Sequence, residues 1–508
     1  MILDGRRGKE MDMQYSGGKL VQPERLLDLD GEYDVIVTGG GIAGVGAAVS
    51  AARSGCKTLL VEKETALGGL ATIGLVNIPM DFLSGTGKEM FKELEKINGL
   101  ERRNSDPEKH KLVLDRMVLK SGCKMLLDTC VVDSVMDKNR ICGVVVESKA
   151  GRKAVLAKRV VDCSGDADAA YYAGCDCKFG RASDGLTQAC STEFRLGGVD
   201  WDRYVGSGFQ EENPRWIKVI KRALDNGDIP YMIENHLNWM THVPGRPEHC
   251  GKDEVSICMA HSRNCHPLDN HDLTRMYVEG REQVDILWRF IKKYIPGFEG
   301  CYLIDTGTLL GVRDTRRVIG EYVLTGADLA RHRHFEDVIA ISHHGYDMHN
   351  PDAPGNIKFI RMEIKGQTRY VVYAKGGVFT TKLDFPDGDM PPGGADVLCD
   401  VEGRTSEEMQ FPVPVYHDIP YRCLVPLKVE NLLVAGRCLS ADFEAQSGSR
   451  LIMACMAMGE AAGTAAAMSL KADIPPRKIP VDELQNILVR NGGDIGQQFR
   501  KITALRKA

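Results

Sequence analysis

A glycine-rich turn between an apolar strand and an alanine-rich helix constrains the fold of this chain most. The strand covers residues 33–37 (Tyr-Asp-Val-Ile-Val) and stops at the pattern Gly39-x-Gly41-x-x-Gly44. A helical pattern follows over residues 42–53, and residues 58–61 form a second continuous apolar run that ends at Glu62. A strand, a glycine turn, a helix and a second strand in this order predict a βαβ unit and an α/β fold.

Each glycine of the turn has a separate physical role. Gly39 allows the tight turn, Gly41 lets the backbone approach a pyrophosphate, and Gly44 permits close packing of the helix on the strand. The helix N-terminus supplies free N–H groups and partial positive charge for phosphates. Glu62 can accept both hydroxyls of an adenosine ribose and would repel a 2′-phosphate. The unit therefore predicts a dinucleotide site, which NAD and FAD would both fit.

Composition and charge exclude several classes of protein. The chain has 508 residues, of which 43% are hydrophobic and 27% charged, as in a well-packed globular enzyme. Its 65 basic and 70 acidic residues give a net charge of −5, so neither nucleic acid nor an anionic membrane is an expected partner. The apolar run over residues 451–470 contains Glu460 and is expected to be a buried helix rather than a membrane span.

The cysteines and the first residues indicate a reducing compartment. None of the sixteen cysteines forms a C-x-x-C pair, so free thiols are expected. Residues 1–32 contain no apolar run typical of a secretory signal. We therefore expect a cytoplasmic protein.

The cofactor-binding pattern returns near the end of the chain. Short strands are expected over residues 125–127, 131–135, 143–147 and 159–162, and a long helix over residues 273–294. Residues 431–436 again form a strand that ends in glycine, and an alanine-rich helix follows from about Arg450. We expect an N-terminal extension (1–32), a cofactor-binding domain in two parts (33–173 and 427–508) and an inserted substrate domain (174–426).

Two further segments favour FAD over NAD. Residues 68–72 (Gly-Gly-Leu-Ala-Thr) follow Glu62 closely, and residues 160–166 form another strand that ends in glycine. With these segments the chain resembles the FAD-dependent oxidoreductases of the glutathione-reductase and fumarate-reductase flavoprotein superfamily. Within that superfamily it is most similar to the large bacterial family that begins with D-V-x-V-x-G-G-G-x-A-G and ends with N-L-L-V-A-G-R-C. The segments that carry this resemblance further are 311–322, 346–351, 419–422 and 431–467.

The resemblance implies a discontinuous, Rossmann-like FAD-binding domain with an inserted mixed α+β substrate domain. It implies that Glu62 holds the adenosine ribose, that a backbone group near Val132 meets adenine, and that Asp166 and Gly436 neighbour the ribityl chain. A helix beginning within residues 448–453 would direct a partial charge of about +0.5 at the flavin pyrimidine and stabilise its reduced anion. The residues expected to bind FAD are Gly39, Gly41, Ile42, Ala43, Gly44, Glu62, Lys63, Gly68, Gly69, Leu70, Ala71, Thr72, Val132, Ser164, Gly165, Asp166, Gly436, Arg437, Arg450, Leu451 and Met453.

Histidines supply the candidates for proton transfer. Five of the thirteen lie between residues 331 and 350, namely His332, His334, His343, His344 and His349. Oxidising a C–OH group or saturating a C=C bond moves a proton together with the hydride, and imidazole titrates in a useful range. We favour His349 as the catalytic group, because its Tyr-Asp-Met-His-Asn-Pro segment resembles one that approaches the flavin in relatives. A loop histidine with a structural hydrogen bond is the alternative for each of the five.

Arg313 and Tyr421 complete the predicted catalytic set. Arg313, Arg316 and Arg317 would share one face if they lay on a helix, where they could bind a carboxylate or phosphate. Ion pairs with Asp314 or Glu321 are the structural alternative. We expect Arg313 to orient the substrate and Tyr421, next to Arg422, to hydrogen-bond its reacting oxygen.

Metal and dithiol chemistry have little support in the sequence. The cluster of His249, Cys250, Cys258, His261, Cys265 and His266 matches no familiar zinc or iron–sulfur spacing, so we expect no metal. Residues 175–177 (Cys-x-Cys) are not the pair of a disulfide reductase, which would stand where Ala71 and Thr72 do. No histidine lies beside that turn for covalent flavin attachment, so the FAD is expected to be non-covalent.

The expected function is hydride transfer between FAD and a small hydroxyl-bearing substrate, either carbohydrate-derived or carboxylated. A flavin-dependent reductase of activated C=C bonds (an enoate reductase) and a flavin-bearing electron-transfer subunit of a complex stay open as alternatives. No second G-x-G-x-x-G occurs mid-chain, so a dedicated NAD(P)H domain is not expected. We expect a partner that accepts or donates electrons, which the sequence does not identify. Assembly into a homo-oligomer stays open.

Overall fold

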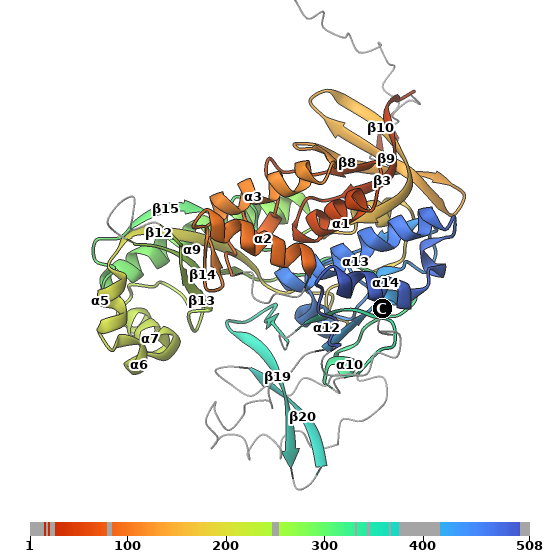
Figure 1. Cartoon of the computed structure of the whole chain (residues 1–508). Coiled ribbons are helices and arrows are strands. Elements are labelled where there is room, and N and C mark those ends of the chain that lie inside the picture. The colour runs from red at the N-terminus through yellow and green to blue at the C-terminus, as the bar shows by residue number, and fades with distance from the viewer. Residues whose placement is uncertain are drawn as a thin grey trace, which may run out of the picture.

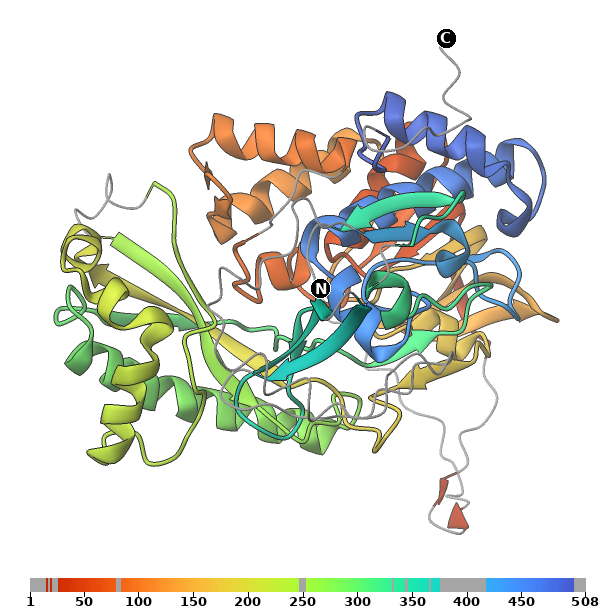
Figure 2. The same cartoon turned by 90° about the horizontal axis from the view of Figure 1, so that it is seen from below.

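The computed structural model describes residues 15–16, 19–20, 26–78, 84–245, 253–330, 333–342, 346–364, 367–374 and 417–497. Two bodies are visible in Figures 1 and 2. One contains the N-terminal and C-terminal elements, drawn in red, orange and blue, and the other contains yellow-green elements from the middle of the chain. Each body has its own hydrophobic core.

A seven-stranded sheet forms the centre of the first body. Its strand order is β7 (Lys124–Leu126), β4 (Thr58–Val61), β3 (Asp28–Thr38), β10 (Gly151–Asp162), β9 (Arg140–Ser148) and β8 (Cys130–Asp137), and β22 (Leu432–Val434) also pairs with β10. Strands β4, β3, β10 and β22 run parallel, so their carboxyl ends meet at one edge of the sheet. Ligands of open α/β sheets bind at this edge.

Two glycine- and alanine-rich helices cover this sheet and lie side by side in Figure 1. They are α1 (Ile42–Arg53) and α13 (Ile452–Lys471). A Cβ atom at Gly459 would lie 1.9 Å from the carbonyl oxygen of Ala43, and one at Gly463 would lie 2.2 Å from that of Ala47. The small residues of both helices thus let their backbones touch, and α13 is buried in the core.

Within the described residues no single helix is long and apolar enough to cross a membrane. Only α12 (Phe443–Ser449) and α13 taken together reach that length, and they are bent by 92° relative to each other.

The second body contains a four-stranded antiparallel sheet. Its order is β13 (Trp239–His242), β14 (Asp253–Ser262), β12 (Cys190–Val199) and β15 (Tyr302–Thr306). The long helix α9 (Asn270–Tyr294) packs on β14 and β12. The hydrophobic core of this body includes Trp216, Phe290 and Phe298. The short helices of this body are α5 (Trp201–Gly206), α6 (Phe209–Glu212) and α7 (Ile217–Asp225).

Smaller elements connect the two bodies or cover them. Strand β17 (Val338–Ser342) pairs with β21 (His417–Pro420), and both contribute to the same core as α1 and α13. The others are β11 (Cys177–Phe179) with β16 (Arg316–Val318), β18 (Met348–His349) with β19 (Asn356–Ile364) and β20 (Gln367–Ala374), β1 (Tyr15–Ser16) with β2 (Lys19–Leu20), β5 (Leu100–Glu101) with β6 (Asn104–Ser105), and the helices α2 (Gly85–Lys96), α3 (Pro107–Lys120), α4 (Asp168–Tyr172), α10 (Gly326–Ala330) and α14 (Val481–Arg490).

The α/β, Rossmann-like fold class predicted from the sequence is confirmed. Helix α1 has the expected bounds, and α9 begins three residues before the expected helix at residue 273. The strand near residue 432 joins the sheet that contains β3, as a two-part domain requires. The domain boundaries themselves stay a prediction.

One local expectation is wrong. Arg313, Arg316 and Arg317 do not share a helix face, because residues 316–318 form strand β16, which pairs with β11. In an extended segment neighbouring side chains alternate in direction. The three arginines accordingly have different partners.

Candidate active site

The glycine turn lies between β3 and α1, where the chain's own packing requires two of the three glycines. Gly39 has a φ of 90°, and a Cβ atom there would lie 2.5 Å from the carbonyl oxygen of Cys163. A Cβ atom at Gly44 would lie 1.7 Å from the carbonyl oxygen of Gly39. In contrast, a Cβ atom at Gly41 would meet no atom of the described chain within 4 Å. The start of α1 is therefore open to a ligand on the side of Gly41.

Glu62 lies at the end of β4 and faces this turn. One carboxylate oxygen accepts a hydrogen bond from the Gly40 N–H, and the other accepts one from the Glu64 N–H at 2.8 Å. Only 6% of Glu62 is exposed, and burial raises its pKa although both N–H groups oppose that shift. Glu62 thus holds the turn in place and stands where an adenosine ribose would bind in a Rossmann-like site.

The second glycine turn packs directly on the first. The Gly68 N–H donates to the carbonyl oxygen of Gly40 at 2.8 Å, and Gly68 has a φ of 99°. The Thr72 hydroxyl donates to the carbonyl oxygen of Leu67 at 2.6 Å, which closes the short helix at residues 69–71. Gly436 follows β22, and a Cβ atom there would lie 3.0 Å from that of Ala43. The structure therefore brings these predicted FAD residues together at one edge of the sheet.

A network of charges surrounds Asp166 beyond the end of β10. Its carboxylate lies 2.9 Å from the Arg437 guanidinium and 3.9 Å from the Lys63 ammonium, and it accepts the Thr315 hydroxyl at 2.8 Å. Burial alone would raise the pKa of Asp166, but Arg437 and Lys63 lower it overall. The predicted cofactor residues Lys63, Asp166 and Arg437 thus form one contact group. Ser164 donates instead to Asp162, inside the sheet edge.

The chain turns sharply between α12 and α13, and Arg450 lies at this bend. Helix α13 begins after Leu451, which caps it without a side-chain hydrogen bond. The Arg450 guanidinium donates to the Asp347 carbonyl oxygen at 2.8 Å and lies 3.2 Å from the Asp347 carboxylate. It also donates to the Gln188 side chain at 3.2 Å. The bend therefore connects the start of α13 with the segment that contains His349.

His349 is oriented by an acid on one side and by an amide on the other. Its Nε2 lies 3.5 Å from the Asp347 carboxylate, and its Nδ1 accepts a hydrogen bond from the Asn238 amide at 3.4 Å. Because an amide nitrogen can only donate, Nδ1 is unprotonated and Nε2 carries the proton toward Asp347. His349 is 5% exposed, so this arrangement lies in the protein interior.

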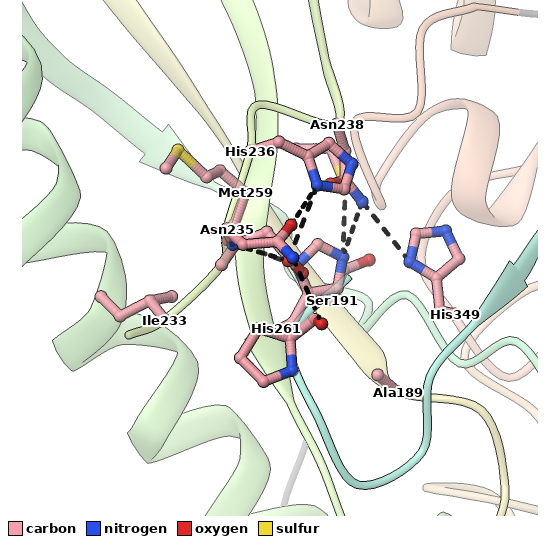
Figure 3. Close-up of polar contacts among 12 residues, drawn as sticks. Ala189, Ser191, Ile233, Asn235, His236, Asn238, Met259, His261 and His349 are labelled. Atoms are coloured by element: carbon pink, nitrogen blue, oxygen red, sulfur yellow. Dashed lines mark hydrogen bonds and ion pairs between the residues drawn. The ribbon is translucent and has the colours of Figure 1, made fainter. Parts of the chain in front are cut away.

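A second imidazole lies against the first, as Figure 3 shows. The ring of His261 stacks on that of His349 with centroids 5.2 Å apart. His261 Nε2 accepts from the same Asn238 amide at 3.3 Å, and its Nδ1 faces the Met259 carbonyl oxygen at 3.2 Å and the Glu234 carboxylate at 3.4 Å. Each imidazole therefore presents an unprotonated nitrogen to Asn238.

Burial and a nearby cation keep both imidazoles neutral. Burial lowers the pKa of His349 to about 4, with a further lowering by Arg313, while Asp347 opposes the shift. Burial, Arg313, His349 and Arg263 all lower the pKa of His261. A neutral imidazole can accept a proton, whereas only a protonated imidazole readily donates one.

Arg313 lies beside this pair of imidazoles. Its guanidinium donates to the Ala189 carbonyl oxygen at 2.7 Å and lies 3.5 Å from His261 Nε2. Its own carbonyl oxygen accepts from the Gln446 amide on α12 at 2.8 Å. Arg317 instead pairs with Asp314, as the structural alternative expects, and Arg316 pairs with Asp168, which that alternative did not name.

The expectation that Tyr421 binds the substrate is wrong. Tyr421 is 2% exposed and packs in the core with β17 and α13, and its hydroxyl donates to the Pro476 carbonyl oxygen at 2.9 Å. That bond uses the one proton of the hydroxyl, and burial raises its pKa. The neighbouring Arg422 pairs with Asp337 at 2.9 Å.

Only some of the other candidate residues lie within the part of the chain that the structure describes. His334 is largely exposed and lies 3.6 Å from Asp418. His332, His343, His344, His249 and Cys250 lie outside the described residues. Among the described residues no group of three or more His, Cys, Asp or Glu side chains could hold a metal.

Sequence reasoning did not assign a role at this site to Asp347, Asn238 or His261. Asp347 stands beside His349 in the segment that carried the family resemblance, and this proximity was an available signal. Asn238 directly precedes β13, and His261 belongs to β14. Only the antiparallel pairing of these two strands brings the two residues together. Local sequence patterns do not report such pairing.

A parallel sheet with a glycine turn at a helix N-terminus and an acid at the next strand end defines a Rossmann-like cofactor-binding enzyme. A model of the FAD dependent oxidoreductase family matches residues 34–380 and 391–488. The chain belongs to this family, and its cofactor is FAD.

Relatives of known function match only part of the chain. Thiamine thiazole synthase of Methanococcus maripaludis is 29% identical over 154 residues, which are 28% of this chain and 59% of that protein. The tRNA uridine 5-carboxymethylaminomethyl modification enzyme MnmG of Dichelobacter nodosus is 41% identical over 75 residues, 15% of this chain and 11% of that enzyme. The chain thus spans less than two thirds of the length of these relatives.

Solved structures show more distant likeness. A geranylgeranyl bacteriochlorophyll reductase-like protein from Thermoplasma acidophilum is 12% identical and covers 94% of this chain and 95% of its own, with a TM-score of 0.37. The p-nitrophenol 4-monooxygenase PnpA from Pseudomonas putida is 13% identical and covers 57% of this chain and 70% of its own, with a TM-score of 0.34.

Proposed function

We propose that this enzyme oxidises a C–OH group of a small hydroxyl-bearing substrate and that His349 accepts the hydroxyl proton. The observation that carries the proposal is the pairing of His349 Nε2 with Asp347, which leaves Nδ1 of a buried, neutral imidazole unprotonated. The contact of Nδ1 with the Asn238 amide is long, at 3.4 Å, and a substrate hydroxyl would replace it. Bound FAD would supply the acceptor for the hydride that leaves the same carbon. Oxidation of the alcohol would then give a carbonyl compound, with the hydride on the cofactor and the hydroxyl proton on His349.

The resemblance implies that the residues at the sheet edge hold FAD, and their geometry supports this assignment. The open side of Gly41 and the N–H groups at the start of α1 would hold the pyrophosphate, and Glu62 would hold the ribose. The segment from Gly68 to Thr72, which packs on the first turn, would line the flavin side. Val132 on β8 would meet adenine. These individual contacts belong to the proposal.

The protonation state of His349 favours oxidation of an alcohol over reduction of an enoate. A histidine that acts as general base must be neutral before the reaction, whereas saturation of a C=C bond needs an acid that gives up a proton. His349, with its pKa lowered to about 4, is neutral near pH 7. Asp347 is partly exposed, so it offers the accepted proton a route from His349 Nε2 toward solvent.

The two alternatives make different demands on the site. An enoate reductase would need a proton donor, which neutral His349 is poorly suited to be. An electron-transfer subunit would need no buried base beside its cofactor. The catalytic role of Arg313 is proposed to be electrostatic: its charge lies next to both imidazoles and would stabilise an alkoxide that develops there.

Anaerobic mixing of the holoenzyme with polyols, hydroxy acids and enoates tests the proposal. Loss of visible flavin absorbance with a hydroxyl compound is the expected result. Reoxidation of chemically reduced enzyme by an enoate, without bleaching by any hydroxyl compound, would favour the reductase. No response in either direction would favour the electron-transfer subunit.

A further inference from the structure

Hydrogen bonds from Arg215 to the backbone of residues 237 and 238 hold Asn238 in place. The guanidinium of Arg215 donates to the carbonyl oxygens of Leu237 and Asn238, each at 3.1 Å, and the Leu237 N–H donates back to Arg215 at 2.8 Å. Arg215 and Trp216 have φ values of 51° and 62°, which residues other than glycine rarely adopt. Such strained conformations occur preferentially at functional sites. The position of Asn238 is therefore fixed independently of the imidazoles it touches.

The Asn238 side chain is only half satisfied. Its amide nitrogen donates to His261 Nε2 and His349 Nδ1, as the dashed lines of Figure 3 show. Its carbonyl oxygen Oδ1 is buried and has no hydrogen-bond partner among the described residues. A buried acceptor without a donor destabilises the folded protein. An acceptor of this kind beside a base is suited to a ligand that brings a donor.

We propose that Asn238 is a substrate-binding residue whose Oδ1 accepts a hydrogen bond from a substrate hydroxyl, so that the substrate class is an alcohol with at least one further hydroxyl group. The inference rests on the proposed function, because it places that hydroxyl beside the one deprotonated by His349. Polyols and sugars meet this requirement.

The acceptor character of the site determines which ligands it selects. Asn238 Oδ1 is an acceptor without a partner among the described residues, and His349 Nδ1 is an acceptor whose one contact, with the Asn238 amide, is 3.4 Å long. A ligand that reaches both atoms must therefore present O–H or N–H groups to them. A carboxylate presents only acceptors and would face Oδ1 without a hydrogen bond. Selection against such ligands follows, because a site that hydrogen-bonds a substrate donor rejects analogues that lack it.

Binding is measured in a variant that reacts slowly. Holoenzyme carrying His349→Ala is titrated with glycerol, D-glucose and crotonate, and perturbation of the oxidised flavin spectrum reports binding. The same titrations follow for His349→Ala combined with Asn238→Ala, with Asn238→Asp, or with Asn226→Ala as a matched control. Asn226 lies on the surface of the same body, where its amide contacts only the Tyr294 hydroxyl among the described hydrogen bonds.

Glycerol and glucose are expected to bind the parent variant, and Asn238→Ala is expected to weaken that binding about tenfold or more. Asn238→Asp keeps an acceptor oxygen but loses the N–H donor to His261 Nε2, so it should bind hydroxyl compounds more weakly than the parent and more tightly than Asn238→Ala. Asn226→Ala should bind them as the parent does. Equal binding in the parent and Asn238→Ala, or equal loss in Asn238→Ala and Asn238→Asp, overturns the inference. So does a parent that responds to crotonate alone, or to none of the hydroxyl compounds. If Asn238→Ala does not fold, the Asp variant alone decides between retained and lost binding.

The proposed function fails separately. Hydroxyl compounds that bind through Asn238 but never bleach the wild-type flavin would remove the proposed oxidation and leave the binding site. Bleaching that does not depend on Asn238 would do the reverse.

Discussion

The ring of His261 on β14 stacks on the ring of His349 on β18, with centroids 5.2 Å apart and planes inclined by 24°. The two residues are 88 positions apart in the sequence, and each directs an unprotonated nitrogen at Asn238. Arg313 lies close enough to lower the pKa of both. The predictions below follow from this arrangement and from the glycine-lined cofactor edge.

Replacing His349 by alanine should slow flavin reduction by a hydroxyl substrate. A positioned base contributes about 10² to 10⁴ in rate, so stopped-flow reduction should fall by that factor while bound FAD is retained. His271→Ala is the matched control, because His271 lies on the exposed start of α9. A His349 variant with a lower melting temperature and a normal rate of reduction would show a purely structural histidine.

The buried histidines should make the protein less stable in acid. The folded pKa of His349 is about 4, whereas an unfolded histidine titrates near 6.5, so between these values the unfolded chain binds a proton that the folded chain does not. Stability present above about pH 6.5 is therefore lost as the pH falls toward 4, by about 1.4 kcal/mol per pH unit at most for each such group. His110, with its pKa also lowered to about 4 by burial, adds to the effect.

Urea unfolding of wild type and His349→Gln at neutral and mildly acidic pH measures this contribution. The Gln variant should lose less stability on acidification than wild type does, and His271→Gln should match wild type. Parallel curves for wild type and His349→Gln would mean that His349 does not titrate below its ordinary range.

Replacing Glu62 by glutamine should weaken FAD binding without changing the chemistry of enzyme that keeps FAD. Charge-assisted hydrogen bonds contribute about 1.5 to 3 kcal/mol each, and the amide would also place a donor or a weaker acceptor against the Gly40 N–H. Equilibrium dialysis or flavin fluorescence gives the affinity. Glu64→Gln is the control, since only the Glu64 backbone N–H contacts Glu62. Unchanged affinity in Glu62→Gln would place the ribose elsewhere.

Two glycine substitutions should separate cofactor binding from folding. Gly41→Val adds atoms on the open side of the turn, so the apoprotein should fold while FAD retention is lost. Gly459→Ala would place its Cβ atom 1.9 Å from the Ala43 carbonyl oxygen and should force α1 and α13 apart. Melting curves of the apoproteins beside the FAD content distinguish the two effects. A Gly41 variant that retains FAD would contradict the assigned pyrophosphate position.

The glycine turn and the strand ends beside it could be predicted from the sequence because their signals are local. Gly39, Gly44 and Glu62 follow the strands that position them, so period, turn and strand end could be located without knowledge of distant contacts. The composition of α1 and α13 likewise reflects a direct backbone contact between them.

The catalytic side depends on contacts between distant segments and was predicted less well. Arg313, Arg316 and Arg317 have helical spacing, but pairing of residue 318 with Cys177 makes the segment a strand. Tyr421 precedes the return to the sheet as expected, yet its hydroxyl is taken by Pro476, 55 residues later. Asn238 joins the site only because Trp239 pairs with Cys258 across two strands.

The most direct test of His349 as the base is the pH dependence of the second-order rate constant for anaerobic flavin reduction by a hydroxyl substrate. This constant reports ionisation of the free enzyme. It should rise as the pH rises through about 4 and then level off, because only neutral His349 accepts the proton, and His349→Ala should lose this ionisation. A rate constant that is highest in acid and falls as the pH rises would show that a protonated group is required and would contradict the account.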